Sequence, residues 1–364
     1  MRVVVAPDSF KGSVTADDAA RALASGWLAH RPGDDVRLLP LADGGEGTVD
    51  AFAAARPDAE RRSVTVPGPD GQPVSADWLL LPDRTAVLEL AQSSGLPLMA
   101  SPDPLGAHTY GLGAVARAAL DAGATRLVIG LGGSASTDGG TGALRALGLR
   151  LHDDRGRELP LGGAALAELA RLDTTDLLPA PPGGVQLLVD VTAPLTGPAG
   201  AAATYGPQKG AGPAEVALLD GALGRFAGLA DGAPDQPGAG AAGGTAYGLA
   251  ALWDARITPG AATIAALVGL GDELAGADVV LTGEGRFDET SLTGKVVGSL
   301  LDAAGATAVP VGLVAGQISG TVPGSVSAAM SLVELAGSVD VALNDPTTWL
   351  AAAGEALSRR LARG

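Results

Sequence analysis

Strand-like and helix-like segments alternate at both ends of this chain but not in its middle. Near the N-terminus, the β-branched runs 2–6 and 36–41 are each followed by an Ala-rich helical pattern, at 15–29 and 46–55. The alternation returns near the C-terminus, with strands expected at 278–282, 309–315 and 326–329 and helices at 296–304 and 347–362. Alternation of this kind is typical of parallel sheets with helices on both faces.

The middle of the chain has a different pattern. Short runs at 63–66, 74–81 and 85–90 are separated by Pro, Gly and Asp turns, which predicts an antiparallel meander. Further strands are expected at 126–130, 149–152 and 185–191, with helices at 112–122 and from about 139. The middle therefore forms a sheet of its own, with mixed strand directions.

The two stretches of alternation together make one doubly wound parallel sheet that the middle interrupts. We therefore predict two α/β domains: a discontinuous flavodoxin-like domain at 1–58 and 277–364, and an inserted mixed-sheet α/β domain with the meander at 59–276. In a sheet of order 2-1-3-4-5, the loops after the first and third strands meet at the switch point. The loops 7–13 and 282–289 would then face each other.

Composition excludes several classes of function. The 364 residues include no Cys and only three His, which excludes disulfides, Cys-based metal centres and a thiol nucleophile. A formal charge of −16 argues against nucleic acid or an anionic membrane as a partner. We find neither a signal peptide nor an apolar run long enough to span a membrane, and therefore expect a cytoplasmic protein.

Six glycine-rich loops carry most of the side chains that could do chemistry. They lie at 7–13, 42–48, 130–140, 205–210, 238–244 and 282–289. A glycine-rich turn lets backbone N–H groups converge on an anion, and phosphate must approach the main chain closely. Any single glycine loop is ordinarily just a turn, but six of them favour a polyphosphate site. The residues predicted to grip a nucleotide are Gly44, Gly45, Gly132, Gly133, Ser134, Asp138, Gly283 and Lys295.

Only three lysines occur, Lys11, Lys209 and Lys295, and each stands beside a glycine. Codon bias toward Arg explains their scarcity but not their positions. A compact point charge suits a phosphate. We predict that Lys11 takes part in catalysis and that Lys209 binds the substrate together with Ser9 and Arg286, whose guanidinium could clamp a carboxylate or a phosphate with two hydrogen bonds.

Carboxylates stand in or beside the same loops. Asp43, Glu46 and Glu284 are predicted Mg²⁺ ligands, because Mg²⁺ takes oxygen ligands and bridges protein carboxylates to substrate phosphates. Bound Mg²⁺ would also offset the repulsion between the negative charge of the protein and that of ATP. Phosphoryl transfer needs a group that orients or deprotonates the attacking hydroxyl. The candidates for this catalytic group, among which the sequence leaves the choice open, are Asp8, Asp190 and Asp288.

A different motif fits part of the third loop. Gly130–Ala135 matches the Gly-x-Gly-x-x-Gly/Ala dinucleotide fingerprint after a strand, and Asp153 and Asp154 follow at the distance of a ribose-binding acid. The alternative is therefore an NAD(P)-dependent oxidoreductase of a small hydroxy acid, and a nucleotide-binding module without turnover is a third option. An oxidoreductase has no obvious use for the first, second and sixth loops, and binding alone does not need six.

Taken in order, the loop sequences closely resemble those of one family. They are APDSFK at 6–11, PLADGGEGT at 40–48, GGSASTDGG at 132–140, YGPQKGA at 205–211, GAGAAGG at 238–244 and TGEGRFD at 282–288. This set resembles the bacterial glycerate kinases of the type II family, from residue 6 to at least residue 295. One departure is Ala193, which stands where Asn is expected.

The resemblance implies a phosphotransferase with an alcohol group as acceptor. It implies an ATP- and Mg²⁺-dependent kinase that converts D-glycerate to phosphoglycerate, with release of ADP, in glyoxylate and glycerate metabolism. It also implies two α/β domains with the active site in the cleft between them. It favours phosphorylation at the 2-position over the 3-position and leaves a homodimer open. The expected partners are D-glycerate and ATP, with no nucleic acid and no membrane.

Overall fold

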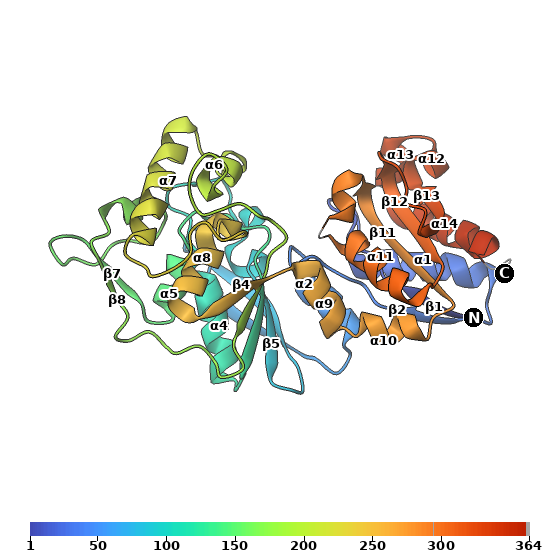
Figure 1. Cartoon of the computed structure of the whole chain (residues 1–364), viewed down its shortest axis with the longest axis horizontal. Coiled ribbons are helices and arrows are strands. Elements are labelled where there is room, and N and C mark those ends of the chain that lie inside the picture. Colours follow the sequence, from blue (N-terminus) through green and yellow to red (C-terminus); the bar gives the residue numbers. More distant parts are fainter. Residues whose placement is uncertain (294, 362–364) are drawn as a thin grey trace. The chain divides into compact units, whose positions relative to one another are not determined.

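The computed structural model describes residues 1–293 and 295–361. By its internal contacts, the chain divides into two compact units, which are described here one at a time (Figure 1). The first unit comprises 1–43, 50–57 and 259–364, and the second comprises 44–49 and 58–258. The first unit thus includes residues 259–276, which the expected boundary at 277 assigns to the inserted domain. None of the described helices is long and apolar enough to cross a membrane.

The first unit is built on a five-stranded sheet in which every pair of neighbouring strands is parallel. The order is β13-β12-β11-β1-β2, which in chain order is 2-1-3-4-5 with the first strand beside the third. The strands are β1 (Arg2–Val5), β2 (Asp35–Leu38), β11 (Val279–Phe287), β12 (Val311–Ile318) and β13 (Val326–Ser331). Because Val3, Val4 and Val5 are all fully buried, helices must cover both faces of the sheet. The predicted fold class is confirmed.

Helices from opposite ends of the chain pack together on this sheet. Gly26 and Gly354 lie where α1 (Ala16–His30) meets α14 (Pro346–Leu361), and a Cβ at Gly354 would come within 2.2 Å of the Leu23 carbonyl oxygen. Glycine therefore permits the close crossing of the two helices. The other helices of this unit are α2 (Thr48–Ala55), whose first two residues fall in the second unit, α9 (Gly260–Leu267), α10 (Leu270–Ala275), α11 (Val296–Thr307), α12 (Leu332–Ala336) and α13 (Val339–Asn344).

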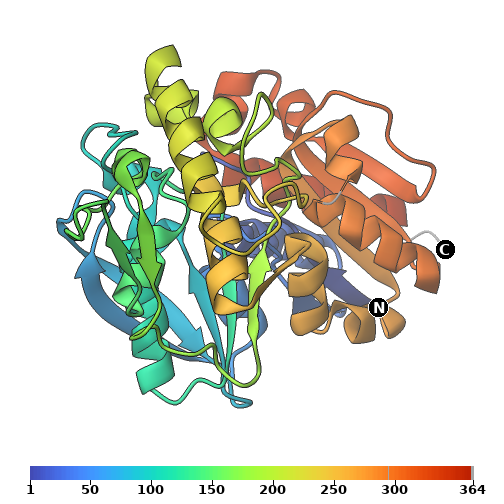
Figure 2. The ribbon, with the colours of Figure 1, turned by 60° about the vertical axis from the view of Figure 1, so that its left-hand side comes forward.

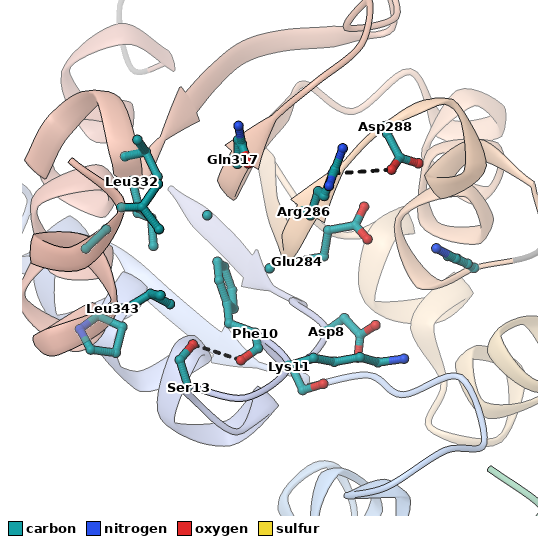
Figure 3. A pocket seen from close by; sticks show the side chains of 18 of the residues that line it. Asp8, Phe10, Lys11, Ser13, Glu284, Arg286, Asp288, Gln317, Leu332 and Leu343 are labelled. Carbon is teal, nitrogen blue, oxygen red and sulfur yellow. Dashed lines mark hydrogen bonds and ion pairs between the residues drawn. The ribbon is translucent and has the colours of Figure 1, made fainter. Parts of the chain in front are cut away.

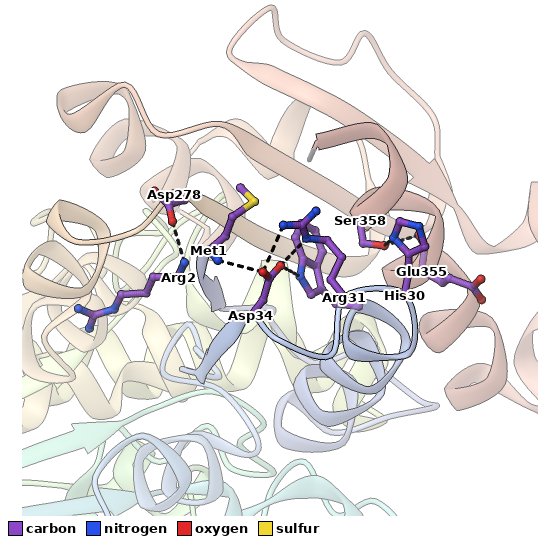
Figure 4. A network of polar contacts seen from close by, with 9 residues as sticks. Met1, Arg2, His30, Arg31, Asp34, Asp278, Glu355 and Ser358 are labelled. Carbon is purple, nitrogen blue, oxygen red and sulfur yellow. Dashed lines mark hydrogen bonds and ion pairs between the residues drawn. The ribbon is translucent and has the colours of Figure 1, made fainter. Parts of the chain in front are cut away.

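A polar network fixes the connection between α1 and β2 (Figure 4). The Asp34 carboxylate accepts hydrogen bonds from the N-terminal amine at 2.9 Å, from Trp27 Nε1 at 2.9 Å and from Arg31 Nε at 2.6 Å. These donors, Arg31 above all, hold the pKa of Asp34 well below its usual range. Farther along, Ser358 Oγ lies 2.9 Å from Nδ1 of His30. The network joins structural elements and takes no part in the site described below.

The second unit is built on a six-stranded mixed sheet of order β10-β9-β6-β5-β4-β3. The predicted meander is confirmed, since β3–β4 and β4–β5 are antiparallel, whereas the remaining neighbours are parallel. Figure 2 shows the meander strands in blue. The strands are β3 (Glu60–Pro67), β4 (Pro73–Leu80), β5 (Thr85–Glu89), β6 (Arg126–Gly130), β9 (Val185–Leu188) and β10 (Ala255–Thr258), with a separate antiparallel pair, β7 (Arg150–His152) and β8 (Arg171–Asp173).

One large apolar core underlies this second sheet, and Leu88, Ile129 and Leu187 are among its almost fully buried members. Phe226 and Tyr247 pack edge to face in it, with ring centroids 5.7 Å apart. The helices of the unit are α3 (Ala91–Ser94), α4 (Tyr110–Asp121), α5 (Thr141–Ala146), α6 (Ala201–Tyr205), α7 (Pro213–Ala227) and α8 (Ala241–Trp253).

Candidate active site

A cavity of about 370 Å³ opens in the first unit at the carboxyl ends of β1, β11 and β12 (Figure 3). The loops 7–13 and 282–289 both line it, as predicted for the switch point of the sheet. The Asp8 amide donates to the Gly283 carbonyl at 2.8 Å, which fixes the first loop to β11. The sixth loop differs from the prediction because β11 continues to Phe287, so that its side chains are held by a strand.

The predicted site residues that line the cavity all come from the first unit. They are Asp8, Ser9, Lys11, Asp43, Glu284, Arg286, Asp288 and Lys295. Four of them are carboxylates and three carry a positive charge, so opposite charges gather in a single cavity. Most of these groups lie on the right-hand side of Figure 3.

Asp8 is the most perturbed of these groups. Its side chain is more than nine-tenths buried, and burial together with the negative charge of Asp43 raises the pKa of Asp8 to about 7. The Ser9 amide, which donates to Oδ1 at 2.6 Å, and the charge of Lys11 act in the opposite direction. A carboxyl with a pKa near 7 is suited to accept a proton from a reacting hydroxyl.

Lys11 and Asp43 form an ion pair at the edge of the cavity. The Nζ of Lys11 lies 3.6 Å from Oδ2 of Asp43, and this acid is the main cause of the raised pKa of Lys11. The Lys11 side chain is exposed, so its ammonium can meet a ligand without losing much of its hydration. An ion pair this open contributes little to stability.

Glu284 is buried to a similar degree as Asp8, and its Oε1 has no hydrogen-bond partner among the described residues. Burial is the main cause of its raised pKa. A buried carboxylate oxygen without a donor is suited to a cation. No group of three metal-binding side chains comes together in the part of the chain that the structure describes. Mg²⁺, however, commonly uses only one or two protein carboxylates and takes its other ligands from water and phosphate.

Asp288 is engaged by its own loop. Its Oδ1 accepts hydrogen bonds from the amide and the hydroxyl of Thr290, which caps the short 3₁₀ helix at Glu289–Leu292. These hydrogen bonds lower the pKa of Asp288, which makes it a weaker base than Asp8. Arg286 Nε lies 3.6 Å from Asp288 Oδ2, and Lys295 Nζ donates to Thr290 Oγ1 at 3.1 Å.

The glycines predicted to cradle a nucleotide in the second and third loops are packed against each other. A Cβ at Gly132 would lie 2.4 Å from Cα of Gly45, and one at Gly130 would lie 2.6 Å from the Gly44 carbonyl oxygen. The Gly132 amide donates to that same carbonyl at 3.1 Å. Backbone packing therefore accounts for these glycines. Gly283 behaves likewise, because its Cβ would lie 2.1 Å from the Val314 carbonyl oxygen.

Asp138 lies fully buried behind the third loop, where the chain itself satisfies its carboxylate. Oδ2 accepts from the Thr109 amide, the Thr109 hydroxyl and the Gly142 amide, and Oδ1 accepts from the Gly140 amide, all at 2.8–3.1 Å. The expected contact with a nucleotide is therefore replaced by a structural role. The carboxylate holds together the start of α4 and the start of α5.

Lys209 is also buried, with 2% of its surface exposed. Its Nζ donates to Ser134 Oγ at 2.8 Å and to the Ser136 carbonyl oxygen at 2.5 Å, and burial lowers the pKa of Lys209 to about 7. The sequence predicted a lysine that binds the substrate, but the structure shows an internal amine that ties the fourth loop to the third.

The remaining predicted residues also belong to the second unit. Gly133 and Glu46 are exposed, and Asp190 follows β9 and is partly buried. None of the three lines the cavity of the first unit.

The dinucleotide fingerprint lacks its structural context. A Rossmann fingerprint needs a helix that starts within the glycine turn, but the helix after β6 starts only at Thr141. Asp153 is occupied in a turn, where it accepts from the amides of Arg155 and Arg157. The oxidoreductase alternative is therefore not supported.

One side of the cavity was not predicted from the sequence. Its apolar wall comes from α12, α13 and the start of α14, with Leu332, Val339 and Leu343 among its residues, and Gln317 stands at the end of β12. A signal was present, because Val339, Val341 and Leu343 place three large apolar residues in a short polar stretch. The absence of glycine or acidic motifs there left the segment unassigned.

Buried acids beside Lys and Arg, gathered at the switch point of a doubly wound sheet, are typical of an enzyme that acts on phosphorylated ligands. Residues 3–362 match the model of the glycerate kinase family, so the chain belongs to this family. The match extends past residue 295, where the resemblance of the loops ended.

Individual relatives agree with the family. The chain is 44% identical to the glycerate kinase of Bacillus subtilis (strain 168), over 88% of this chain and 86% of the relative, and 37% identical to the glycerate 2-kinase of Escherichia coli (strain K12), over 100% and 99%. A crystal structure assigned as glycerate kinase 2 from Salmonella typhimurium LT2 superposes with a TM-score of 0.85 at 36% identity, covering 100% of this chain and 98% of that one. The protein is a glycerate kinase and therefore a phosphotransferase.

Proposed function

We propose that the enzyme transfers the γ-phosphoryl group of Mg²⁺-bound ATP to the 2-hydroxyl of D-glycerate, giving 2-phosphoglycerate and ADP. The observation that carries this proposal is the set of buried acids beside three cationic side chains in the cavity of the first unit. Phosphoryl transfer needs these parts, since charge must be neutralised and a hydroxyl must be oriented. The relative named glycerate 2-kinase favours the 2-position.

Asp8 is the proposed proton acceptor for the substrate hydroxyl. The amide of Ser9 holds Oδ1, which leaves Oδ2 for the hydroxyl. A base with a pKa near 7 has a usable unprotonated fraction at neutral pH and still has the strength to take a proton as the oxygen attacks. Of the three candidates from the sequence, Asp8 alone combines a place in the cavity with a raised pKa.

Three cations are proposed to hold the anionic groups. Arg286 is exposed at the end of β11, where its guanidinium can bind the glycerate carboxylate with two hydrogen bonds. Lys11 and Lys295 are proposed to neutralise charge on the phosphoryl oxygens as it shifts during transfer. Ser9, which also lines the cavity, is the proposed neutral contact with the substrate.

Glu284 and Asp43 are the residues that would hold Mg²⁺. The orphaned Oε1 of Glu284 and the oxygen of Asp43 near Lys11 fit a hard cation. When bound, the ion supplies charge neutralisation at the β- and γ-phosphates. In the second unit, Glu46 stays a predicted Mg²⁺ ligand, Gly133 a predicted nucleotide contact and Asp190 a candidate catalytic group. A cytoplasmic location is part of the proposal, and light scattering would test for a homodimer.

The decisive experiment follows the reaction itself. Purified enzyme with Mg-ATP should release ADP in the presence of D-glycerate and release far less with L-glycerate, and ³¹P–¹H NMR of the product should show phosphate on carbon 2. Phosphate on carbon 3 would overturn the regiochemistry, and turnover only with a different hydroxy acid would overturn the substrate. Mg-ATP should also raise Tm whereas NAD(P) should not.

A further inference from the structure

The cavity in the first unit has two chemically different ends. In Figure 3, the charged groups Asp8, Glu284 and Arg286 lie on the right, and Leu332 and Leu343 lie on the left. The left wall is formed by Leu332, Val333, Val339, Ala342, Leu343 and Pro346. Between the two ends lies Phe10, whose ring is buried.

Glycerate does not account for the apolar end. It is a three-carbon acid with two hydroxyls, so nearly every part of it seeks a polar partner. A nucleoside triphosphate, by contrast, combines a highly charged chain with a flat and largely apolar base. The cavity has both characters in one continuous space, which matches the whole donor rather than the acceptor alone.

Beside Phe10, two glycines of neighbouring strands line the space between the two ends. Gly285 and Gly316 line the cavity, and a Cβ at Gly316 would lie 2.3 Å from the Gly285 carbonyl oxygen. A side chain at position 316 would collide with the backbone of the neighbouring strand β11, so glycine is required there. A ligand that reaches from the cations to the apolar wall therefore passes the backbone of these glycines and the ring of Phe10.

The apolar wall is only partly covered by the protein. Leu343 is 57% exposed and Val339 is 48% exposed, although both line the cavity. Large apolar side chains grouped at the rim of a charged cavity are typical of a ligand-binding surface. Gln317 adds an exposed amide at the end of β12, able to donate to and accept from the edge of a base.

We propose that the nucleobase of the phosphoryl donor lies against Val339, Leu343 and Leu332, with its phosphates directed toward Lys11 and Lys295. The nucleotide is then held within the first unit, and the glycine loops of the second unit are not its main grip. This inference rests on the proposed function, since it takes ATP as the donor, but it assigns a base subsite that the loop sequences did not indicate.

The test compares two residues of the same short helix. Leu343→Ser removes part of the wall, whereas Val341→Ser changes a residue of comparable exposure, 45% accessible, that does not line the cavity. Leu343→Ser should raise the Kd for Mg-ADP and the KM for ATP about tenfold, because burying a leucine side chain is worth this much or more. Val341→Ser should leave both values within twofold of the parent, and neither change should move the KM for glycerate.

A third ligand separates the base from the phosphates. Tripolyphosphate has no base, so its affinity should be equal for the parent and for Leu343→Ser and should fall in Lys295→Ala. An unchanged Kd for Mg-ADP in Leu343→Ser, or a rise in the KM for glycerate instead, would overturn the base subsite while leaving the kinase activity intact. A parent enzyme without turnover of ATP would instead overturn the proposed function.

Discussion

The two units contain acids and lysines in similar glycine loops but use them in opposite ways. In the first unit, Asp8 and Glu284 are buried against a cavity, and Glu284 keeps an oxygen without a partner among the described residues. In the second, Asp138 and Lys209 are also buried, but the backbone and Ser134 occupy their polar atoms. The same kind of glycine loop therefore presents polar side chains to a cavity in the first unit. In the second unit it holds polar side chains whose hydrogen bonds are made within the protein.

The difference follows from what each loop meets. The loops of the first unit end parallel strands at a switch point, where neighbouring connections run to opposite faces and leave space. The third and fifth loops of the second unit meet other backbone instead. The Gly139 amide donates to the Gly243 carbonyl at 3.0 Å, and a Cβ at Gly243 would lie 2.1 Å from the Ser136 carbonyl oxygen. Glycine there permits contact between two loops.

The largest effect should come from the first unit. Asp8→Asn removes the proposed proton acceptor and should lower kcat about a thousandfold, while Tm is unchanged or higher because a buried acid has been neutralised. Asp288→Asn is the matched control in the same cavity and should lose less than tenfold. The measurement is steady-state ADP release with both substrates saturating. Equal losses in the two variants would remove the distinction between them.

A buried acid of the second unit should affect stability and not turnover. Asp138→Asn replaces one of the two acceptor oxygens with an NH2 group, which then faces at least one of four donors, and the free energy of unfolding should fall by about 2 to 3 kcal/mol. Asp83→Asn, which changes a single hydrogen bond in an exposed turn, should cost less than 1 kcal/mol. Urea denaturation gives both values. A loss of kcat in folded Asp138→Asn without a loss of stability would show that this acid meets a ligand after all.

Lys209 should give the second unit a pH-dependent stability. The pKa of Lys209 is about 7 in the folded protein and 10.5 in an unfolded chain. Between pH 7 and pH 10.5, the unfolded chain therefore binds a proton that the folded chain has released. The free energy of unfolding of the parent should therefore rise with pH in this window, by about 1.4 kcal/mol per unit relative to Lys209→Met. Below pH 7 the cost of burying the charge is present in full.

The comparison is made by denaturation of both proteins at pH 7.5 and 8.5. Ser134→Ala removes an acceptor of Lys209 but keeps the buried amine, so it should retain the parental pH dependence. Parallel curves for the parent and Lys209→Met would mean that this amine stays charged when folded.

The smallest effect concerns the outer part of the cavity in the first unit. Arg286→Lys keeps the positive charge but loses the planar fork, so the KM for glycerate should rise about fivefold with little change in kcat. Its side chain is 66% exposed, which leaves folding unaffected. A rise in the KM for ATP alone would assign Arg286 to the phosphates instead of the glycerate carboxylate.

The sequence predicted the fold and part of the site. The alternating strands and helices at the two chain ends were enough to predict the strand order of the first sheet. The position of the switch point follows from that order. The same strand order predicted that the loops of Asp8 and Glu284 face each other. The extension of β11 through the sixth loop was missed, since Gly283 and Gly285 interrupt its apolar pattern. The roles of Asp138 and Lys209 depend on neighbours such as Thr109 and Ser134, which no local pattern identifies.

The pairing of β1 with β11 has a consequence for how the chain acquires its structure. Val3 lies opposite Val279, so β1 gains this neighbour only after the whole second unit has been made. The second unit is nearly continuous and can collapse while β1, α1 and β2 are still incomplete. Contacts that join such distant segments form slowly. We therefore expect the first unit to fold last, with the apolar strand β1 exposed to aggregation until translation ends.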